Sequence, residues 1–533
     1  MPQLQPGLPP PPDYYARNLR FLFREVCRRS GALLTPPERA MVTAYLAETP
    51  GAQRLFARLA SRAGRWIRED SLAYPEVGDL GAALNRLVDA GLVERLPDAP
   101  ADALLRLLTR RELAACFPRV RGRTKADWVA DCLARHDDRR IRRVIAARHP
   151  WVALAAPERL RACTVLFFGS DESDLSAFVI QDLGVRRYEA YALDERSRPF
   201  ATRPDLDRYL LSRRLAAWSH RLDDVPALAG AMLRLLWPAA RSRTEQRARD
   251  RVLNRLGRWH ERRGELDAAL TCFGRSTGHP ARERRARLLH RLGDDSGLAG
   301  VLKDMRQDPW GPEEVDFAAR FPGRRRSAPA RITECRLGGG VPARIERHAL
   351  ALLSANGGRG WHLENALPLG LAGLAFWDVV FAPVAGAFSH PLQDAPQDLF
   401  WPDFARVRRG LIDARLAELA APGAFAAALR STWQDKQGIS NRLVRWGRLS
   451  AEALDALLDA APHDRLLALA ERAIRDPAGA RTGFPDLLMV YGPGAWELVE
   501  VKGPTDSLQP AQRTWLSRLD GLGLPARVLR FTA

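Results

Sequence analysis

The sequence contains little cysteine, no long apolar run and fewer acidic than basic residues. Its six cysteines are scattered through 533 residues without any C-x-x-C pair, which argues for a reducing cytoplasm and against a zinc finger or a disulfide framework. No apolar run reaches transmembrane length, and the proline-rich residues 6–12 lack the apolar core of a signal peptide. We therefore expect a cytoplasmic protein of two to four domains, without membrane segments.

The shortage of acids is uneven along the chain. The formal net charge is +19, of which residues 1–330 carry about +17 and residues 331–533 about +2, counting unit charges. An arginine-rich composition explains part of the excess, but it should not confine that excess to one side of residue 330. The basic part therefore predicts a phosphate-rich partner, most simply DNA.

The hydrophobic pattern predicts an α+β protein that is mostly helical and has four parts. Residues 1–100 are expected to form a helical region that binds DNA, a pattern that also suits many other small helical domains. Residues 101–150 read as a helical hairpin and residues 151–325 as a helical connector. Residues 330–533 are expected to form an α/β domain with a small mixed sheet, after a Pro-, Gly- and Arg-rich linker at 321–329.

The hairpin at 101–150 has a basic loop between two helices, predicted at 103–116 and 125–135. Thr124 and Asp127 are suited to capping the second helix, whose N-terminus could then bind phosphate. A purely structural helical pair fits the same residues. If the hairpin binds DNA, its phosphate contacts are expected from the following residues: Arg119, Arg121, Arg123 and Lys125.

The connector combines an apolar run with helical hairpins. Residues 163–168 (CTVLFF) are a strand or the buried end of a helix, and residues 174–185 predict an amphipathic helix that Gly184 stops. The motif G-x-L-x-x-A-L at 264–270 is typical of a TPR-like repeat. A run of arginines that includes Arg247 and Arg251 forms a solvated helix face or a track for DNA, and the charge asymmetry favours the track.

Residues 483–502 contain two apolar runs around the turn Tyr491-Gly492-Pro493-Gly494, which predicts a β-hairpin. Because side chains alternate along a strand, Leu498, Glu500 and Lys502 share one face, with Asp486 at the start of the neighbouring strand. Two carboxylates buried close together are costly unless a cation binds them, and Mg²⁺ or Mn²⁺ prefers such oxygens. Taken alone, the pattern P-D…E-x-K also suits an ordinary hairpin with a surface ion pair.

Four motifs coincide in the C-terminal part: WHLEN at 361–365, LAGLAFWDVVFAP at 371–383, the Gly-Phe-Pro-Asp hairpin ending in Glu500-Val501-Lys502, and QRTWL at 512–516. Together they resemble a VRR-NUC domain of the PD-(D/E)xK nuclease superfamily, specifically that of the Fanconi-associated nuclease family in its bacterial form. The order of helical N-terminal region, SAP-like hairpin at 101–150, TPR-like helices and nuclease domain resembles that family as well.

The resemblance implies a set of site residues. Asp486, Glu500 and the main-chain carbonyl of Val501 would hold one or two Mg²⁺ or Mn²⁺ ions, and Lys502 would position the attacking water or stabilise charge on the phosphate. A third acid is implied at Glu364, with Glu346 as the alternative. Gln512, on a helix expected at 507–519, would reach back toward the strand of the metal site.

The resemblance also implies a function. Members are structure-selective DNA nucleases that cut 5′ flaps near the junction and degrade from 5′ ends during repair of interstrand cross-links. The expected partner is therefore branched or flapped DNA, and the expected place is the bacterial nucleoid. No ubiquitin-binding finger is implied, given the scattered cysteines. Two alternatives remain at this point, a Holliday-junction resolvase-like endonuclease and a non-catalytic DNA-binding scaffold; the intact Asp486, Glu500 and Lys502 speak against the scaffold.

Overall fold

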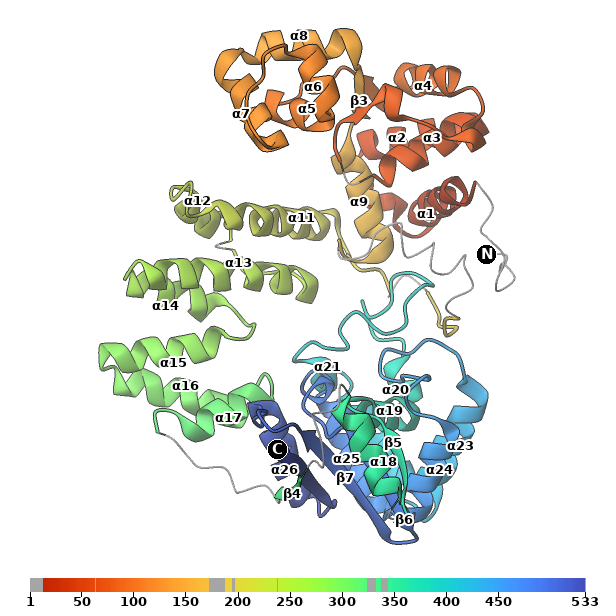
Figure 1. Ribbon diagram of the computed structural model, residues 1–533, viewed down its shortest axis with the longest axis vertical. Coiled ribbons are helices and arrows are strands. Elements are labelled where there is room, and N and C mark those ends of the chain that lie inside the picture. The colour runs from red at the N-terminus through yellow and green to blue at the C-terminus, as the bar shows by residue number, and fades with distance from the viewer. Residues whose placement is uncertain are drawn as a thin grey trace. The chain divides into compact units, whose positions relative to one another are not determined.

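The computed structural model describes residues 13–62, 64–171, 187–193, 197–236, 238–323, 332–336, 344–355 and 357–532. The chain divides into two compact units, Met1–Val185 with Phe200–Leu206 (unit 1) and Arg186–Pro199 with Asp207–Ala533 (unit 2). The described residues are mostly helical and carry a three-stranded and a five-stranded sheet (Figure 1). The predicted α+β, mostly helical class is confirmed. None of the helices in this described part combines the length and apolar character needed to cross a membrane.

Unit 1 packs helices around a small antiparallel sheet of order β1-β3-β2. Its helices are α1 (Tyr14–Ser30), α2 (Pro36–Ala47), α3 (Pro50–Ala60), α4 (Leu80–Asp89), α5 (Ala101–Leu107), α6 (Arg110–Cys116), α7 (Lys125–Arg135), α8 (Asp138–Arg148) and α9 (Pro157–Phe168). Its strands are β1 (Ile67–Arg68), β2 (Val93–Arg95) and β3 (Trp151–Leu154). Helix α11 (Arg203–Trp218) begins in unit 1 and continues in unit 2.

The predicted helix at 103–116 is two helices, α5 and α6. Leu108 is extended, with ψ 147°, and Thr109 caps α6 through reciprocal hydrogen bonds with Glu112. A capping box of this kind starts a new helix more favourably than it continues an old one. The second predicted helix is confirmed as α7, which Thr124 caps with Asp127 in the same reciprocal way.

The apolar run at 163–168 is the buried end of a helix and not a strand. It forms the second half of α9, which begins with Pro157 at its first position and ends at Gly169 in the left-handed conformation. Burial of almost the whole run removed the polar face that would have marked it as helical. The helix predicted at 174–185 lies outside the described residues, as does the linker at 321–329 beyond residue 323.

Unit 2 begins with paired helices, which Figure 1 shows in green as a stack. They are α12 (Leu228–Leu235), α13 (Arg243–Arg262), α14 (Leu266–Arg275), α15 (Ala281–Leu292), α16 (Asp295–Gln307) and α17 (Pro312–Arg320). Helices α13 and α14 cross at Gly257, where a Cβ atom would lie 2.7 Å from the ring of Phe273. A TPR-like helical pair needs a small residue where its two helices cross. The α13–α14 pair in the predicted helical connector has such a residue, Gly257.

The C-terminal lobe of unit 2 has a mixed sheet of order β4-β8-β7-β6-β5. Its strands are β4 (Ile332–Arg336), β5 (Arg359–His362), β6 (Leu487–Gly492), β7 (Ala495–Lys502) and β8 (Ala526–Thr532). Its helices are α18 (Ile345–Ala355), α19 (Ala366–Ala375), α20 (Trp377–Val380), α21 (Phe404–Val407), α22 (Arg409–Leu419), α23 (Ala424–Lys436), α24 (Ala451–Ala460), α25 (His463–Arg475) and α26 (Pro510–Gly521). The small mixed sheet and the hairpin at 483–502 are confirmed.

The two faces of the sheet are buried by different elements. Val499 and Val501 point into a cluster with Ala349 and Leu353 of α18, the helix that lies in front of the strands in Figure 1. Leu498 points the other way, into the large core that α19, α25 and α26 complete. The predicted alternation of faces is therefore confirmed, and Glu500 and Lys502 follow Leu498.

Four features of this lobe differ from the sequence prediction. Strand β5, which pairs antiparallel with β6, was not predicted. The expected helix at 507–519 begins only at Pro510, because Gln509 is its N-cap. Helix α25 and strand β4 were not predicted.

Candidate active site

The ends of three neighbouring strands meet at one place on the sheet. Leu363 and Glu364, just beyond β5, donate their N–H groups to the carbonyl oxygen of Asp486 at 3.0 and 2.9 Å. Asp486 directly precedes β6, whose Leu487 pairs with Val499 of β7. One further step in this register places Asp486 opposite Glu500, so backbone pairing alone brings the two acids together.

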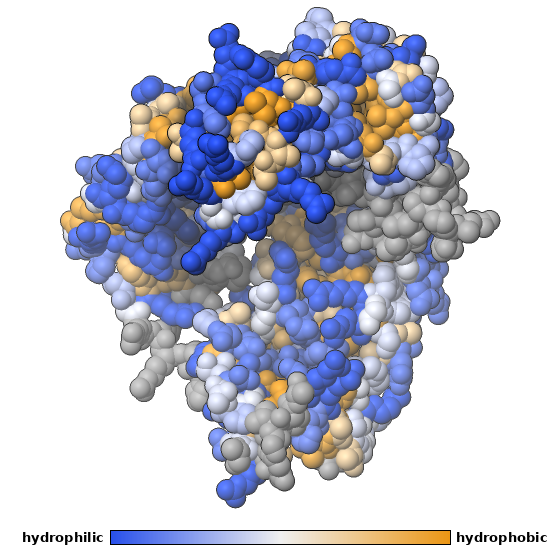
Figure 2. Space-filling model, turned by 45° about the horizontal axis from the view of Figure 1, so that its top comes forward, coloured by the Kyte–Doolittle hydropathy of each residue, from blue (hydrophilic) through white to orange (hydrophobic). Residues whose placement is uncertain are grey.

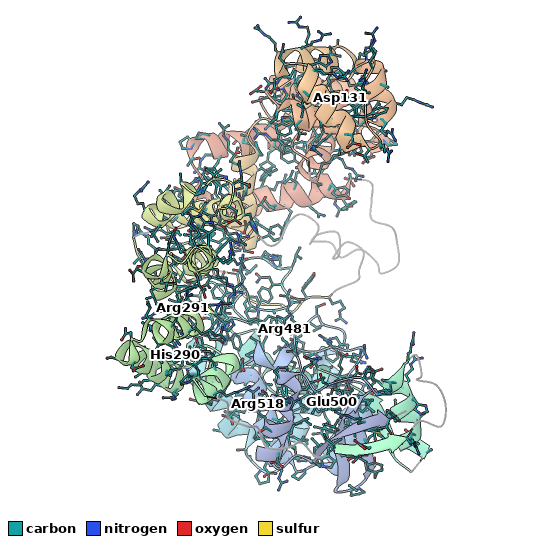
Figure 3. The ribbon with its side chains drawn as sticks, turned by 60° about the vertical axis from the view of Figure 1, so that its left-hand side comes forward. Asp131, His290, Arg291, Arg481, Glu500 and Arg518 are labelled. Carbon is teal, nitrogen blue, oxygen red and sulfur yellow. The ribbon has the colours of Figure 1, made fainter. Side chains whose placement is uncertain are left out.

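Hydrogen bonds join five of the predicted site residues into one group. Oδ2 of Asp486 accepts the N–H of Val501 at 2.9 Å. Oε1 of Glu500 accepts from Nε2 of Gln512 at 2.5 Å and lies 3.0 Å from Nζ of Lys502. Figure 3 shows Glu500 inside the C-terminal lobe. The predicted reach of Gln512 back to the strand is thus present in the structure.

Burial makes both carboxyl groups reluctant to ionise. Glu500 is 1% exposed, and its burial, with the nearby charge of Asp486, raises its pKa from 4.5 to about 7 despite Lys502 and Gln512. Burial also raises the pKa of Asp486, which the Val501 N–H and the Lys502 charge oppose. A cation placed between them would relieve this cost, since it favours the charged form of both.

One oxygen in this group has no partner. Oε2 of Glu500 is buried and accepts no hydrogen bond from any described residue. A buried carboxylate oxygen without a partner is uncommon and is expected where an ion or water belongs. Hard divalent cations take carboxylate and carbonyl oxygens and retain several waters, so Asp486, Glu500 and the Val501 carbonyl are a suitable donor set.

The structure does not gather three acids around one point. No group of three or more His, Cys, Asp or Glu side chains among the described residues is close enough to hold an ion by itself. The backbone places Glu364 beside Asp486, in a turn before α19 and not within the helix. Its φ of +45° lies in the left-handed region, which is strained for this residue type and is often found at functional sites.

The alternative third acid, Glu346, approaches from the other side. It lies in the first turn of α18, and its charge acts on Asp486 and helps to raise the pKa of that carboxyl group, after burial as the main cause. Both candidates therefore lie near Asp486. The backbone of Glu364 is hydrogen-bonded to that of Asp486, and the charge of Glu346 acts on the Asp486 carboxyl group.

Two residues that hold the Gly-Phe-Pro-Asp loop in place were not among the predicted site residues. Oδ1 of Asn365 accepts the N–H of Phe484 at 3.0 Å, which ties the loop to the start of α19. Gly483 has φ +86°, and a Cβ atom there would lie 2.7 Å from the backbone carbon of Ala511 in α26. The motifs WHLEN and GFPD contain both residues, so their presence in those motifs was the available signal.

Replacing Gly483 by alanine should destabilise the protein by about 2–4 kcal/mol, because it adds left-handed strain to a clash with backbone. Gly438 is the matched control: it has φ +79° but open space around its Cβ position, so Gly438→Ala should cost only about 1 kcal/mol. Urea unfolding of both variants measures the difference. Equal losses would show that the close approach of α26 is unimportant.

The basic loop before α7, which is predicted to bind DNA, is exposed, and its backbone is hydrogen-bonded to α7. The N–H groups of Arg121 and Arg123 donate to Asp131 and Asp127 of α7 at 2.9 Å each, and Figure 3 shows Asp131 in unit 1. The side chains of Arg119, Arg121 and Arg123 are exposed, whereas Nζ of Lys125 donates to the carbonyl of Arg106 at 2.7 Å. Over unit 1, Figure 2 shows hydrophilic residues interspersed with apolar patches.

The arginines of α13 differ in their surroundings. Arg249 is 3% exposed and bonds to the carbonyl oxygens of Pro238 and Leu236, so it is structural. Arg255 donates to the Ala216 carbonyl and to Ser219. Arg247 lies over the ring of Trp401 at 5.2 Å, and Arg251 is exposed. The helix is therefore neither a uniform solvated face nor a continuous basic track.

Comparisons with known proteins agree with this geometry. Residues 420–533 match the VRR-NUC domain family, and residues 13–94 match the family described as FAN1, HTH domain. A Fanconi-associated nuclease 1 homolog from Pseudomonas aeruginosa is 31% identical over 97% of this chain and 95% of its own. One from Arabidopsis thaliana is 27% identical over 99% of this chain and 68% of its own.

Solved structures of a Fanconi-associated nuclease resemble this chain over nearly its full length. A crystal structure of paFAN1 bound to 2nt 5′flap DNA with gap has a TM-score of 0.85 and 29% identity, and covers 99% of both chains. A second, with 1nt 5′flap DNA, has a TM-score of 0.80 and 28% identity and covers 98% of this chain and 99% of its own. The sequence identity, the shared fold and the VRR-NUC match place this chain in the Fanconi-associated nuclease family, as a structure-selective DNA nuclease that depends on a divalent metal ion.

Proposed function

We propose that the protein cuts 5′ flaps near their junction, degrades DNA from 5′ ends, and acts in the repair of interstrand cross-links. The catalytic part of this proposal rests on the pair of half-buried Asp486 and buried Glu500, whose Oε2 has no hydrogen-bond partner among the described residues. The flap preference is supported by the likeness to paFAN1 structures that contain 5′flap DNA. End-labelled flap, nicked, forked and four-way DNA, each with Mg²⁺, Mn²⁺ or chelator, tests it; preferential cleavage of the four-way junction would favour a resolvase-like enzyme instead.

The residues of the candidate active site have different proposed roles in phosphodiester hydrolysis. Asp486, Glu500 and the Val501 carbonyl would hold Mg²⁺ or Mn²⁺, which when bound supplies Lewis acidity that activates water and offsets charge at phosphorus. Lys502, whose Nζ lies 3.0 Å from Glu500, is placed to orient the attacking water or to stabilise charge on the phosphate. Gln512 fixes the rotamer of Glu500 through its 2.5 Å hydrogen bond.

We assign the third acid to Glu364, which the backbone holds beside Asp486, and keep Glu346 as the alternative. Glu364→Gln and Glu346→Gln separate the two, because loss of a metal ligand should raise the Mn²⁺ concentration needed for half-maximal cleavage about 10–100-fold. A normal metal requirement in Glu364→Gln, together with a raised one in Glu346→Gln, would reverse the assignment.

DNA is proposed to be held through its backbone by the exposed loop arginines of unit 1, with Arg247, Arg251 and Lys125 as further contacts. Phosphate contacts position the duplex without reading its sequence, which suits selection by shape. The four proposed parts remain 1–100 and 101–150 for DNA binding, 151–325 as connector and 330–533 as nuclease, and association with the nucleoid is part of the same proposal.

The combined variant Arg119→Gln, Arg121→Gln, Arg123→Gln should weaken DNA binding equally for different sequences. Each lost phosphate contact lowers the slope of log K against log [salt] by about 0.9, so the slope should fall by about 2–3. Fluorescence anisotropy at several salt concentrations measures both effects. An unchanged slope would remove this loop from the DNA interface.

A further inference from the structure

Arg448 lies beside the candidate active site and has a histidine as its partner. Its Nη1 lies 2.9 Å from Nδ1 of His362, the last residue of β5. The next two residues, Leu363 and Glu364, donate their N–H groups to the carbonyl of Asp486. Arg448 is therefore anchored to the strand end that also holds Asp486.

The nature of this partner decides what the arginine can bind. A guanidinium group has only donors, so Nδ1 of His362 is the acceptor in this hydrogen bond. An imidazole nitrogen orients the arginine without bringing a negative charge to it, whereas a carboxylate would also cancel the charge of the arginine. Among the described residues, Arg448 has no carboxylate within salt-bridge distance, so its charge remains available.

The segment that carries Arg448 packs against α19 and is called the platform, here defined as residues 439–449. Val444 packs on α19 at Gly373, where a Cβ atom would lie 2.7 Å from the valine methyl group, and Leu449 packs in the same way at Gly370. The indole N–H of Trp446 donates to a carbonyl within the same platform at 2.7 Å. Because α19 begins two residues after Glu364, the platform packs on the helix that follows this site residue in the chain.

The outer side of the platform is basic. Arg442, Arg445 and Arg448 recur every three residues and are exposed, while Leu443 and Val444 are buried and Trp446 is half-buried. Only Arg442 among these three has an acidic partner in the described part of the chain, Asp394 at 3.2 Å. An exposed arginine that a hydrogen bond anchors beside a nuclease site is suited to bind a phosphate.

We propose that Arg448 binds a phosphate of the DNA strand being cut, close to the scissile phosphodiester, and that His362 is the positioning residue that aims it. One edge of the guanidinium group is held by the imidazole, and its other N–H groups remain for phosphate oxygens. The proposal rests on the nuclease activity of the protein and does not depend on the preference for flapped DNA.

Arg448→Gln tests the proposal with any DNA that the wild-type protein cuts. We expect kcat/KM to fall about 10–100-fold for the loss of one charge-assisted phosphate contact. In an Asp486→Asn background, where binding is measured without cleavage, the same change should lower the salt slope by about 0.9. Arg448→Lys should recover most of the slope, and the melting temperature and the Mn²⁺ requirement should stay unchanged.

Arg430→Gln is the matched control. Arg430 is also a partly exposed arginine of this lobe, but two carboxylates, Asp455 and Asp459, lie 2.8 Å from it. Its replacement should leave cleavage and the salt slope unchanged. If Arg448→Gln behaves like this control, or if Arg448→Lys is as impaired as Arg448→Gln with a normal slope, the proposal is wrong.

The role of His362 has its own test. Glutamine can accept the hydrogen bond of Arg448 through its side-chain oxygen, whereas leucine cannot. His362→Gln should therefore keep most of the activity, and His362→Leu should lose about as much as Arg448→Gln. In the double variant His362→Leu, Arg448→Gln the two losses should not add; additive losses would show that His362 acts independently of Arg448.

Discussion

Replacing Asp486 by alanine is expected to abolish DNA cleavage, with a loss of at least about 10³-fold in kcat, as befits a group that acts only with the reacting atoms. The register of β6 and β7 places Asp486 opposite Glu500, and Asp486 accepts the Val501 N–H, so its carboxylate is held beside that of Glu500. DNA binding should be retained or become tighter, because one negative charge near the phosphate is removed. Gel-based cleavage and anisotropy on the same DNA measure the two effects.

The control for Asp486→Ala is a carboxylate of the same lobe that lies on the surface. Among the described residues, Asp455 pairs with Arg430 alone, at 2.8 Å in an exposed contact, and exposed pairs contribute about 0–1 kcal/mol. Asp455→Ala should therefore cut DNA normally. Cleavage by Asp486→Ala at the rate of this control would end the assignment of the site, and failure to bind DNA would mean that the loop at 483–486 had lost its structure.

The sequence predicts the hairpin well because two local signals agree there. The turn at 491–494 sets the register, and the alternation of residues then decides which side chains share a face with Glu500. The contact of Gln512 was also predictable, since α26 follows the strand closely in sequence. What remained hidden depends on pairing between distant segments: β5 is short and contains no regular alternation, and only its pairing with β6 makes it a strand.

The same reason explains the residues that were missed. His362 and Asn365 belong to a recognised motif, but their partners Arg448 and Phe484 are 86 and 119 residues away. On α13 the sequence suggested too much rather than too little. A run of arginines predicts an exposed basic surface, but charge in a sequence does not reveal which arginines are buried. Arg249 looks like a solvated residue and is instead enclosed by carbonyl oxygens.

Glu500→Gln is expected to abolish cleavage and, at the same time, to stabilise the metal-free protein at pH 8. The raised pKa of Glu500, about 7 against 4.5 when unfolded, means that folding favours its neutral form. This contribution is fully present below pH 4.5 and is lost as the pH rises to 7, at a cost of about 3 kcal/mol. Glutamine has nearly the same shape without the charge, so the variant should not lose this folding stability as the pH rises.

Thermal unfolding in chelator between pH 5 and 8 separates these contributions. The wild-type melting temperature should fall relative to that of Glu500→Gln between pH 5 and 7, and the difference should then stay constant. Adding Mg²⁺ or Mn²⁺ should raise the wild-type value more at pH 8 than at pH 6, because binding competes with protons, and should have little effect on the variant. A parallel pH dependence of both proteins in chelator would mean that Glu500 ionises normally, and the case for a cation between Asp486 and Glu500 would then lose its electrostatic basis.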